Sequence, residues 1–435
     1  MSSSIYLLFM ALGAAMSGIS ANYLGTRGAI QFGCLWMIVG AAGMVGTAGN
    51  LTAYIACKCI NAIGIGHLQT MSTTHGVECA PARKRGLLVT LYSVGSGFGS
   101  VVVSLICLGS IKLTTSWSWR TPIILQIPLC VIYAAVFAFF PQSPRWLLVK
   151  DRTEAARKAF SRLYNRDPSS NEVVLQIQAV QLAIQEETRL SSTTRWTEIF
   201  HKNYIRRTFI ALAINIGGAL SGAFFMFTYA AIFFAGFGLT NPVEISMIIN
   251  VCLLAGLLIG PFVVEYLGRR RTIITGYCGM MICMLVFSAT STALGSASET
   301  VHEVLITFLC LFAFMFGGFI GSSQWLASAE LHSVRLRTSG QAFTSFITNI
   351  FVFGTNFWTP YMLNAKYGNM GTNVGYFYFG CELVAVTTLF LILPENARLT
   401  LEQIDEYFVS GRKAWKTSLA RNKRIASGEI IMTGS

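Results

Sequence analysis

Long apolar runs alternate with short polar connections along the chain. An α-helix needs about 20 mostly apolar residues to cross a bilayer core roughly 30 Å thick, and runs of about this length recur throughout the sequence. They predict eleven membrane-spanning helices, at residues 5–22, 29–48, 52–74, 87–110, 121–140, 208–236, 243–264, 272–293, 304–328, 341–363 and 374–393. The pattern therefore predicts an all-α membrane protein that crosses the bilayer many times.

The longest polar connection divides the chain. Five predicted spans form an N-terminal half at residues 1–140, and six form a C-terminal half at 208–393. A linker at 141–207 joins the halves, and a short tail follows at 394–435. Two linker stretches, TEAARKAFSRLY and SNEVVLQIQAVQLAIQEETRL, have the apolar period of a helix. We therefore expect two short helices in the linker.

Lysine and arginine gather in alternate connections. Nearly all of the 32 basic residues lie on one set, which includes the linker and the tail, whereas Lys112, Arg120 and Lys366 lie on the other. Basic connections stay on the cytoplasmic side, so we expect the C-terminus to be cytoplasmic and Met1 to lie outside. The net charge of +13 then faces anionic lipid, and we do not expect nucleic acid as a partner.

The composition excludes a soluble protein. Only 12% of the residues are charged and 53% are hydrophobic, whereas soluble domains carry about 25% charged residues. The 11 cysteines lie almost entirely in apolar runs, which is typical of small buried side chains and not of a disulfide framework or a zinc site. The N-terminus lacks the basic region of a cleavable signal peptide. No catalytic constellation is evident, so we expect neither an enzyme nor a metal or cofactor.

A short motif occurs twice. NYLGTR follows the first predicted span and EYLGRR follows the seventh. In each half the motif is followed, two spans later, by a glutamate and an arginine seven residues apart, Glu78 and Arg85 in the first half and Glu330 and Arg337 in the second. Two halves with the same order of motifs are typical of transporters built from parallel repeats.

Together with four further motifs, the repeat resembles the sugar porter family of the major facilitator superfamily over almost the whole chain. An E-x-x-P-x-x-x-R-G pattern lies at 78–86, WRTPIILQIP at 119–128, PQSPRWLLVK at 141–150 and PENARLTLEQID at 394–405. TPYMLN and VGYFYFGCE are similar to fungal α-glucoside permeases in particular.

The resemblance implies two pseudo-repeated helical halves, with twelve spans, around a central site. Because the first predicted span carries the loop motif at its end, it corresponds to the family's second helix. We therefore expect the family's first helix, which often carries a carboxylate for proton coupling, to be absent here.

The charged motifs are expected to form a latch on the cytoplasmic side. A glycine lets a turn between helices close tightly, and the arginines after it can bind carboxylates and the carbonyl groups at helix ends. Glu330 is the expected partner of Arg269 or Arg270, and Glu78 that of Arg27. The alternative is that these charges only set the topology. The latch candidates are Arg27, Glu78, Arg85, Arg145, Glu265, Arg269, Arg270, Glu330 and Arg337.

Three ionisable residues inside predicted spans are candidates for a functional role, since a charge there costs at least ~2.5 kcal/mol. Lys58 takes the place of a basic residue that in the family faces the carboxylate of the first helix; alternatively it reaches the outer interface. His67 is a candidate proton relay, or a buried, hydrogen-bonded histidine. Glu382 is a candidate for proton coupling, or a protonated and silent carboxyl group.

A sugar presents hydroxyl groups and an apolar ring face, so its site needs amide side chains and an aromatic platform. Trp325 lies at the tryptophan position of the family, although it could also be only a packing residue. The candidate substrate-binding residues are Trp325, Gln324, Asn356, Gln126 and Ser221.

The sequence departs from the family pattern at several of these positions. Gln142 replaces the usual glutamate after the fifth span, and Thr26 replaces an arginine, so the latch of the first half should be weak. In the stretch GALSGAF, Gly218 and Ala219 stand where the family carries two glutamines, and Phe224 where it carries an asparagine. We therefore expect a pocket more apolar than a typical sugar site.

The leading interpretation is transport of a sugar or related polyhydroxy solute by alternating access, coupled to protons if the chain is full length. The resemblance also implies a monomer in the plasma membrane. A carrier or exporter of a more apolar metabolite, a sensor that does not transport, and an inactive truncated paralogue remain alternatives. The short tail argues against a sensor.

Overall fold

The computed structural model describes residues 2–47, 49–79, 85–192, 196–202, 204–224, 226–227, 242–294, 299–333, 336–364, 366–399, 401–409 and 413–426. All regular elements in these ranges are helical. The helices form two compact units, one from Met1–Tyr92 and Ile106–Thr193, the other from Ser93–Leu105 and Thr194–Ser435.

In the described part of the chain, eight helices are long and apolar enough to cross a membrane. The first of them, Ser4–Gly46, is interrupted at Gly25, where φ is 74° and ψ is 168°, so it covers the predicted spans 5–22 and 29–48. The predicted spans 208–236 and 341–363 contain two helices that are not among the eight, α9 (Ile205–Leu220) and α15 (Arg337–Leu363). Part of span 208–236 lies outside the described residues.

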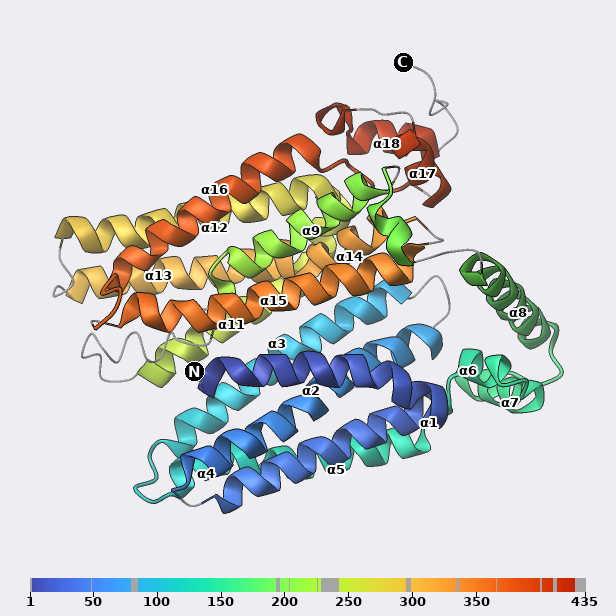
Figure 1. The fold of residues 1–435 in the computed structure, drawn as a ribbon, viewed down its shortest axis with the longest axis horizontal. Coiled ribbons are helices and arrows are strands. Elements are labelled where there is room, and N and C mark those ends of the chain that lie inside the picture. Colours follow the sequence, from blue (N-terminus) through green and yellow to red (C-terminus); the bar gives the residue numbers. More distant parts are fainter. Residues whose placement is uncertain are drawn as a thin grey trace. The chain divides into compact units, whose positions relative to one another are not determined.

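The first unit is a bundle of long helices with a small helical group attached (Figure 1). The bundle consists of α1 (Ser2–Gly46), α2 (Leu51–Cys79), the two end segments of α3 (Arg85–Ser110), α4 (Trp117–Ile124) and α5 (Gln126–Phe139). Helices α1 and α2 are in backbone contact, because a Cβ atom at Gly66 would overlap with the carbonyl group of Met10. Small residues allow this close approach between membrane helices.

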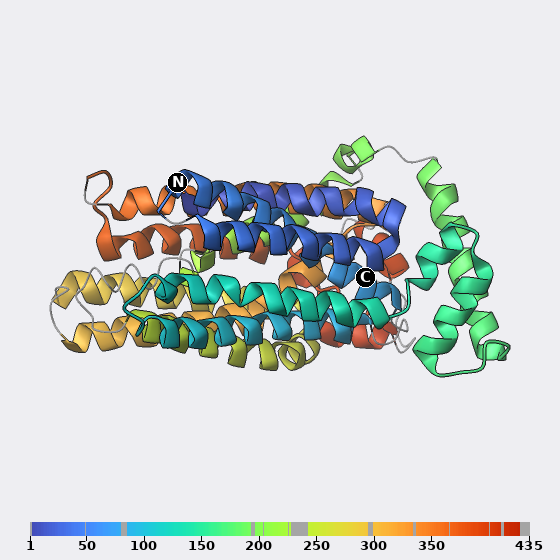
Figure 2. The same ribbon diagram turned by 90° about the horizontal axis from the view of Figure 1, so that it is seen from below.

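The attached group contains the two helices predicted in the linker. It consists of α6 (Pro144–Val149), α7 (Thr153–Tyr164) and α8 (Asn171–Ser192), and in Figure 2 it lies beyond the end of α5. Phe160 of α7 is buried together with Leu147 of α6 and Val173 of α8. The amphipathic pattern of the linker therefore buries its own apolar face within this group.

The second unit contains the remaining helices and one large apolar core. Its elements are η2 (Trp196–Phe200), α9, α11 (Pro242–Leu267), α12 (Arg269–Leu294), α13 (Glu299–Met315), the π-helical segment η3 (Phe316–Gly321), α14 (Ser322–Leu331), α15, η5 (Gly371–Asn373), α16 (Val374–Ile392), α17 (Leu401–Val409), η6 (Ala414–Lys416) and α18 (Leu419–Ala426). Ile214, Tyr277, Phe312 and Tyr378 are fully buried in this core. The segment Ser93–Leu105 of α3 joins this unit, and Nδ2 of Asn250 donates to Oγ of Ser104 at 3.0 Å.

Candidate functional site

The side chain of Glu395, which follows α16, binds the backbone at the turn between α11 and α12. Its carboxylate accepts the backbone N–H groups of Arg269 at 2.9 Å, Arg270 at 3.2 Å and Ala397 at 3.0 Å. The first two groups open helix α12, where the helix dipole favours a negative charge. Gly268 has a positive φ of 84°, and a Cβ atom there would overlap with Glu395. Only glycine therefore fits under this carboxylate.

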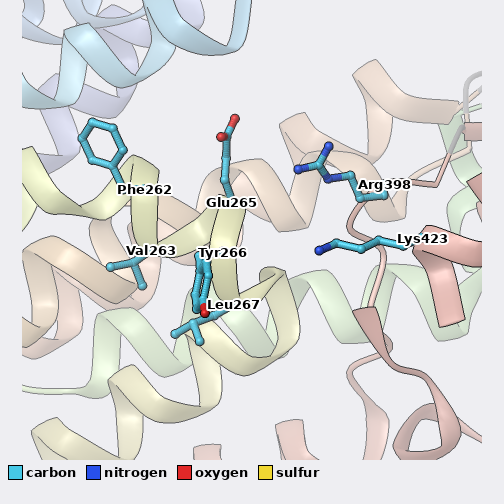
Figure 3. A pocket seen from close by; sticks show the side chains of 7 residues that line it. All are labelled: Phe262, Val263, Glu265, Tyr266, Leu267, Arg398 and Lys423. Atoms are coloured by element: carbon cyan, nitrogen blue, oxygen red, sulfur yellow. The ribbon is translucent and has the colours of Figure 1, made fainter. Parts of the chain in front are cut away.

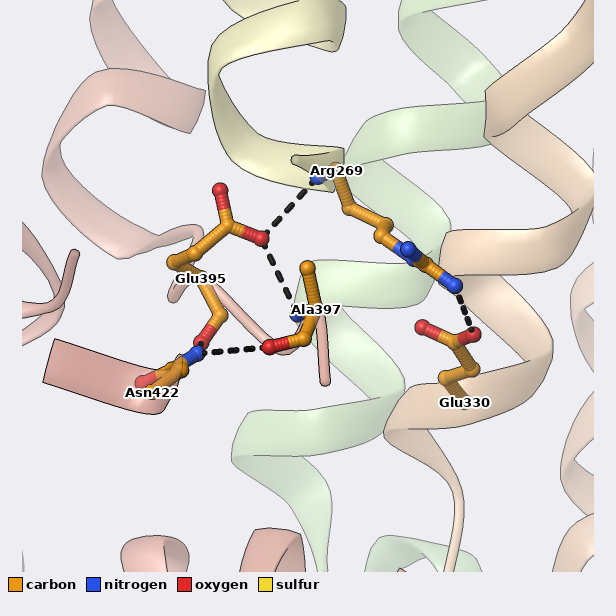
Figure 4. A network of polar contacts seen from close by, with 5 residues as sticks. All are labelled: Arg269, Glu330, Glu395, Ala397 and Asn422. Atoms are coloured by element: carbon orange, nitrogen blue, oxygen red, sulfur yellow. Dashed lines mark hydrogen bonds and ion pairs between the residues drawn. The ribbon is translucent and has the colours of Figure 1, made fainter. Parts of the chain in front are cut away.

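The two arginines that follow Gly268 have separate roles. Nη2 of Arg269 lies 3.1 Å from Oε1 of Glu330 on α14, and both side chains are about four-fifths buried, at 20% and 18% exposure (Figure 4). Arg270 donates to the carbonyl groups of Leu393 and Phe390 at the end of α16. Arg269 and Arg270 thus join the start of α12 to α14 and to the end of α16.

The tail binds the same turn. Nδ2 of Asn422, on α18, donates to the carbonyl oxygens of Glu395 at 2.8 Å and Ala397 at 3.0 Å (Figure 4). Oγ1 of Thr417 accepts the backbone N–H of Glu395 at 2.8 Å. Burial raises the pKa of the Glu395 carboxyl group, and the backbone N–H groups of Ala397, Arg269 and Arg270 oppose that rise. Glu395 therefore connects α12, the end of α16 and the tail.

Gln142 occupies the equivalent place in the first unit. Its Oε1 accepts the backbone N–H of Arg27 at 2.9 Å, and its Nε2 donates to the carbonyl oxygen of Leu24 at 3.2 Å. A Cβ atom at Gly25, which also has a positive φ, would overlap with this amide. The Arg27 side chain donates to the carbonyl oxygen of Phe140 at 3.3 Å. Unlike the carboxylate of Glu395, this amide donates as well as accepts.

We expect Gln142→Ala to lower the free energy of unfolding by about 1.5 kcal/mol, because it leaves a backbone donor and a backbone acceptor without their partner. The thermal midpoint of the detergent-purified protein measures this effect. Gln178→Ala, at an exposed glutamine of α8, is the matched control and should leave the midpoint unchanged. Equal midpoints for Gln142→Ala and wild type would show that Gln142 does not hold the turn.

The other latch candidates are more scattered. Glu78 lies in the last turn of α2, and Arg145 lies in α6 after the N-cap Ser143. Arg85 and Arg337 are the first residues of α3 and α15, and their side chains lie outside the described part of the structure.

Glu265 lies in a groove on the second unit with a volume of about 610 Å³. In Figure 3, Arg398 and Lys423 extend toward the same groove from the segment after α16 and from α18. The groove is lined by Phe262, Val263, Glu265, Tyr266, Leu267, Arg398 and Lys423. Since none of the substrate candidates lines it, we do not assign it to the transported solute.

The candidate residues inside the spans of the first unit have local partners. Nζ of Lys58 lies 4.8 Å from the centre of the Tyr6 ring, which is within the range of a cation–π interaction. His67 is completely buried, and its Nε2 is 2.9 Å from Oγ of Ser20. These contacts favour packing and hydrogen bonding as the roles of the two residues.

Four of the five substrate candidates lie in the second unit. Gln324 and Trp325 follow the π-helical segment η3, a type of distortion that is frequent at functional sites. Trp325 is 41% exposed, whereas Asn356 of α15 is buried. The hydroxyl group of Ser221 is buried and donates to the carbonyl oxygen of Gly218 at 2.9 Å, which favours a role at the end of α9.

The fifth candidate, Gln126, belongs to the first unit. Its Oε1 accepts from Nδ2 of Asn61 at 3.3 Å, and the same Nδ2 donates to the carbonyl oxygen of Met37 at 3.0 Å. Asn61 therefore holds the Gln126 amide in place.

The side-chain amide of Gln324 lies against Gly218, the position at which the family resemblance implies a glutamine. A Cβ atom at Gly218 of α9 would overlap with Oε1 of Gln324. Gln324 is only 9% exposed, and this oxygen has no hydrogen-bond partner among the described residues. Thr355 of α15 donates to the carbonyl oxygen of Ala219 at 3.1 Å, so a hydrogen bond joins α15 to α9 next to Gly218. Glycine at 218 thus makes room for an amide from α14.

The helical fold and the motif-bearing turns define a transporter of the major facilitator type. A family model described as sugar (and other) transporter matches residues 1–408, and the chain belongs to this family. It is therefore an integral membrane protein, and its relatives are transporters, not enzymes.

Known proteins match most of the chain. The high-affinity glucose transporter ght5 of Schizosaccharomyces pombe is 27% identical, over 93% of this chain and 74% of that protein. The hexose transporter HXT13 of Saccharomyces cerevisiae is 25% identical, over 95% of this chain and 75% of that protein. The inward-open structure of the xylose transporter XylE from E. coli matches with a TM-score of 0.77 at 17% identity, over 93% of this chain and 88% of that chain. This structural likeness confirms the predicted fold.

Glu395 is not among the residues predicted from the sequence, and Gln142 enters there only as a lost latch carboxylate and not as a group that caps a turn. Both follow a proline directly after the last predicted span of a half, in PENARL and PQSPRW. Comparing these two positions as a further element of the repeat would have identified them.

Proposed function

We propose that the protein moves a sugar or a related polyhydroxy solute across the membrane by alternating access. Its family membership supports this function, as do relatives that are named glucose and hexose transporters. The observation that carries the proposal is the buried Gln324 amide, whose oxygen has no hydrogen-bond partner among the described residues and can accept a hydroxyl group of a solute. Asn356 of α15 is a further amide of the proposed site in the second unit.

The Arg269–Glu330 pair is proposed to stabilise one conformation of the transport cycle. The pair is mostly buried, so its loss changes the relative free energies of the two states. We further propose that the protein is a monomer of the plasma membrane with a cytoplasmic C-terminus, because the basic residues gather in the connections that include the tail. Coupling to protons is part of the proposal, and a structural neighbour is described as a proton:xylose symporter.

Purified protein in proteoliposomes tests the proposed function. We expect labelled glucose, xylose or maltose to exchange in counterflow above the level of protein-free liposomes. If well-folded protein moves none of these three sugars, the proposed substrate class is wrong.

Gln324→Ala is expected to raise the KM for the transported sugar about tenfold, because the loss of one buried hydrogen bond costs about 1.4 kcal/mol. Gln176→Ala, at an exposed glutamine of α8, is the control and should leave KM unchanged. An unchanged KM for Gln324→Ala in protein with a normal thermal midpoint would remove this residue from the site.

A more apolar substrate is the second candidate. It is favoured by Gly218 and Ala219, which bring no amide groups from α9, and by Ser221, whose hydroxyl group binds the backbone. Inhibition of sugar counterflow by apolar glycosides distinguishes the two. If the apolar glycosides compete more strongly than the free sugars, the pocket is adapted to the apolar part of the solute.

A further inference from the structure

Glu382 is a completely buried carboxyl group in the middle of α16. Its exposed fraction is 0%, and neither carboxyl oxygen has a hydrogen-bond partner among the described residues. Helix α16 lies within Gly371–Ile392, one of the helices able to cross a membrane. Because an unpaired carboxylate in such surroundings costs many kcal/mol, the group holds a proton in this conformation.

In the described part of the chain, no lysine, arginine or histidine interacts electrostatically with Glu382. The titratable groups that interact with it electrostatically are Tyr277 and Cys283 on α12 and Cys381 on α16 itself. The hydroxyl group of Tyr277 donates its proton to the carbonyl oxygen of Ile214 on α9, at 2.8 Å. It is therefore not available to neutralise a carboxylate at Glu382. A deprotonated Glu382 would need water that this conformation excludes.

A continuous series of contacts leads from this region to the proposed site. A Cβ atom at Gly217 of α9 would lie 3.0 Å from the Tyr277 hydroxyl oxygen and 3.3 Å from Cβ of Ala385, one turn after Glu382. A Cβ atom at Gly218 would lie 3.4 Å from the same hydroxyl oxygen and would overlap with Gln324. A rearrangement of Gln324 against α9 therefore affects the helices that enclose Glu382.

We propose that Glu382 is a proton-binding site of the second unit, which releases its proton to water when the transport cycle opens the contact between α9, α12 and α16. The carboxyl group becomes a carboxylate and water accepts the proton, so no other reactant is needed. This inference rests on the proposed transport function, and it gives the second unit its own site for coupling solute movement to protons.

Infrared spectroscopy of the purified protein tests directly whether the Glu382 carboxyl group is protonated. Wild type should show a protonated carboxyl band at neutral pH that Glu382→Gln lacks and Cys381→Ser keeps. The same band in wild type and Glu382→Gln would overturn the proposal. If Glu382→Gln does not purify as a folded protein, Glu382→Asp replaces it. The band should then shift, and an unchanged band would equally overturn the proposal.

Transport assays test the coupling. In proteoliposomes with an imposed proton gradient, Glu382→Gln should lower the ratio of sugar accumulation to counterflow at least tenfold, whereas Cys381→Ser should match wild type. If Glu382→Gln accumulates sugar as wild type does, Glu382 is not the coupling site. If wild type itself shows no counterflow, it is the proposed transport function that fails, which is a different result.

Discussion

Glu395→Ala is expected to lower the free energy of unfolding by about 4 kcal/mol, because it removes one carboxylate that accepts three backbone N–H groups in a buried turn. The side chain is only 2% exposed, so water cannot easily replace it. The start of α12 loses its cap, and Arg269 and Arg270 lose the group that fixes their backbone. The tail should also detach, since Asn422 binds the backbone of the same segment.

The thermal midpoint of purified protein measures the loss, and limited proteolysis of the tail follows its release. Glu395→Gln is the conservative comparison. It keeps one acceptor oxygen but places an NH₂ group against a backbone donor, so we expect an intermediate loss of about 2 kcal/mol. A fall in midpoint no larger than that of Gln142→Ala would contradict the central role of Glu395.

Breaking the Arg269–Glu330 pair is expected to slow sugar counterflow about 30-fold. The two side chains are 3.1 Å apart and mostly buried, and a hydrogen bond between charged groups in such a place contributes about 2 kcal/mol. A change of this size shifts the balance between two conformations by about 30-fold. Because a transport cycle needs both conformations, Glu330→Ala and Arg269→Ala should both be slow even when folded.

A double-mutant cycle isolates the pair from the rest of the turn. The double variant Arg269→Ala/Glu330→Ala should be no slower than either single variant, since each single change already removes the interaction. Arg271→Ala is the matched control, because Arg271 is the neighbouring arginine and its side chain is exposed. Additive effects of the two single changes would show that Arg269 and Glu330 act independently.

Local patterns predicted much of the architecture. The linker stretches 153–164 and 171–192 are helices because their apolar residues recur with the helical period, and Asn165 ends the first of them in a left-handed conformation. The motif EYLGRR predicted a tight turn followed by arginines that bind carboxylates, and the structure places Arg269 beside Glu330. The role of that pair as a latch stays a proposal.

Other features could not be read from local sequence. The missing amides at Gly218 and Ala219 predicted an apolar pocket, but Gln324 of α14 occupies the space that glycine leaves. Ser221 looked like a surviving ligand, yet its hydroxyl group binds the backbone of α9. Both results depend on how neighbouring helices pack, and helix periodicity carries no information about that.

The sequence by itself determined the class of the protein. Apolar length sets the number and extent of the predicted spans, the distribution of basic residues sets the expected orientation, and the repeated motifs identify the family, because each property resides in short stretches of chain. The tertiary structure decided which groups meet across long separations. Glu395 caps a helix that begins 126 residues earlier, and Gln142 caps a turn 115 residues before it. Such pairs depend on side chains that lie directly against the backbone at Gly268 and Gly25, and only the packed helices bring them together.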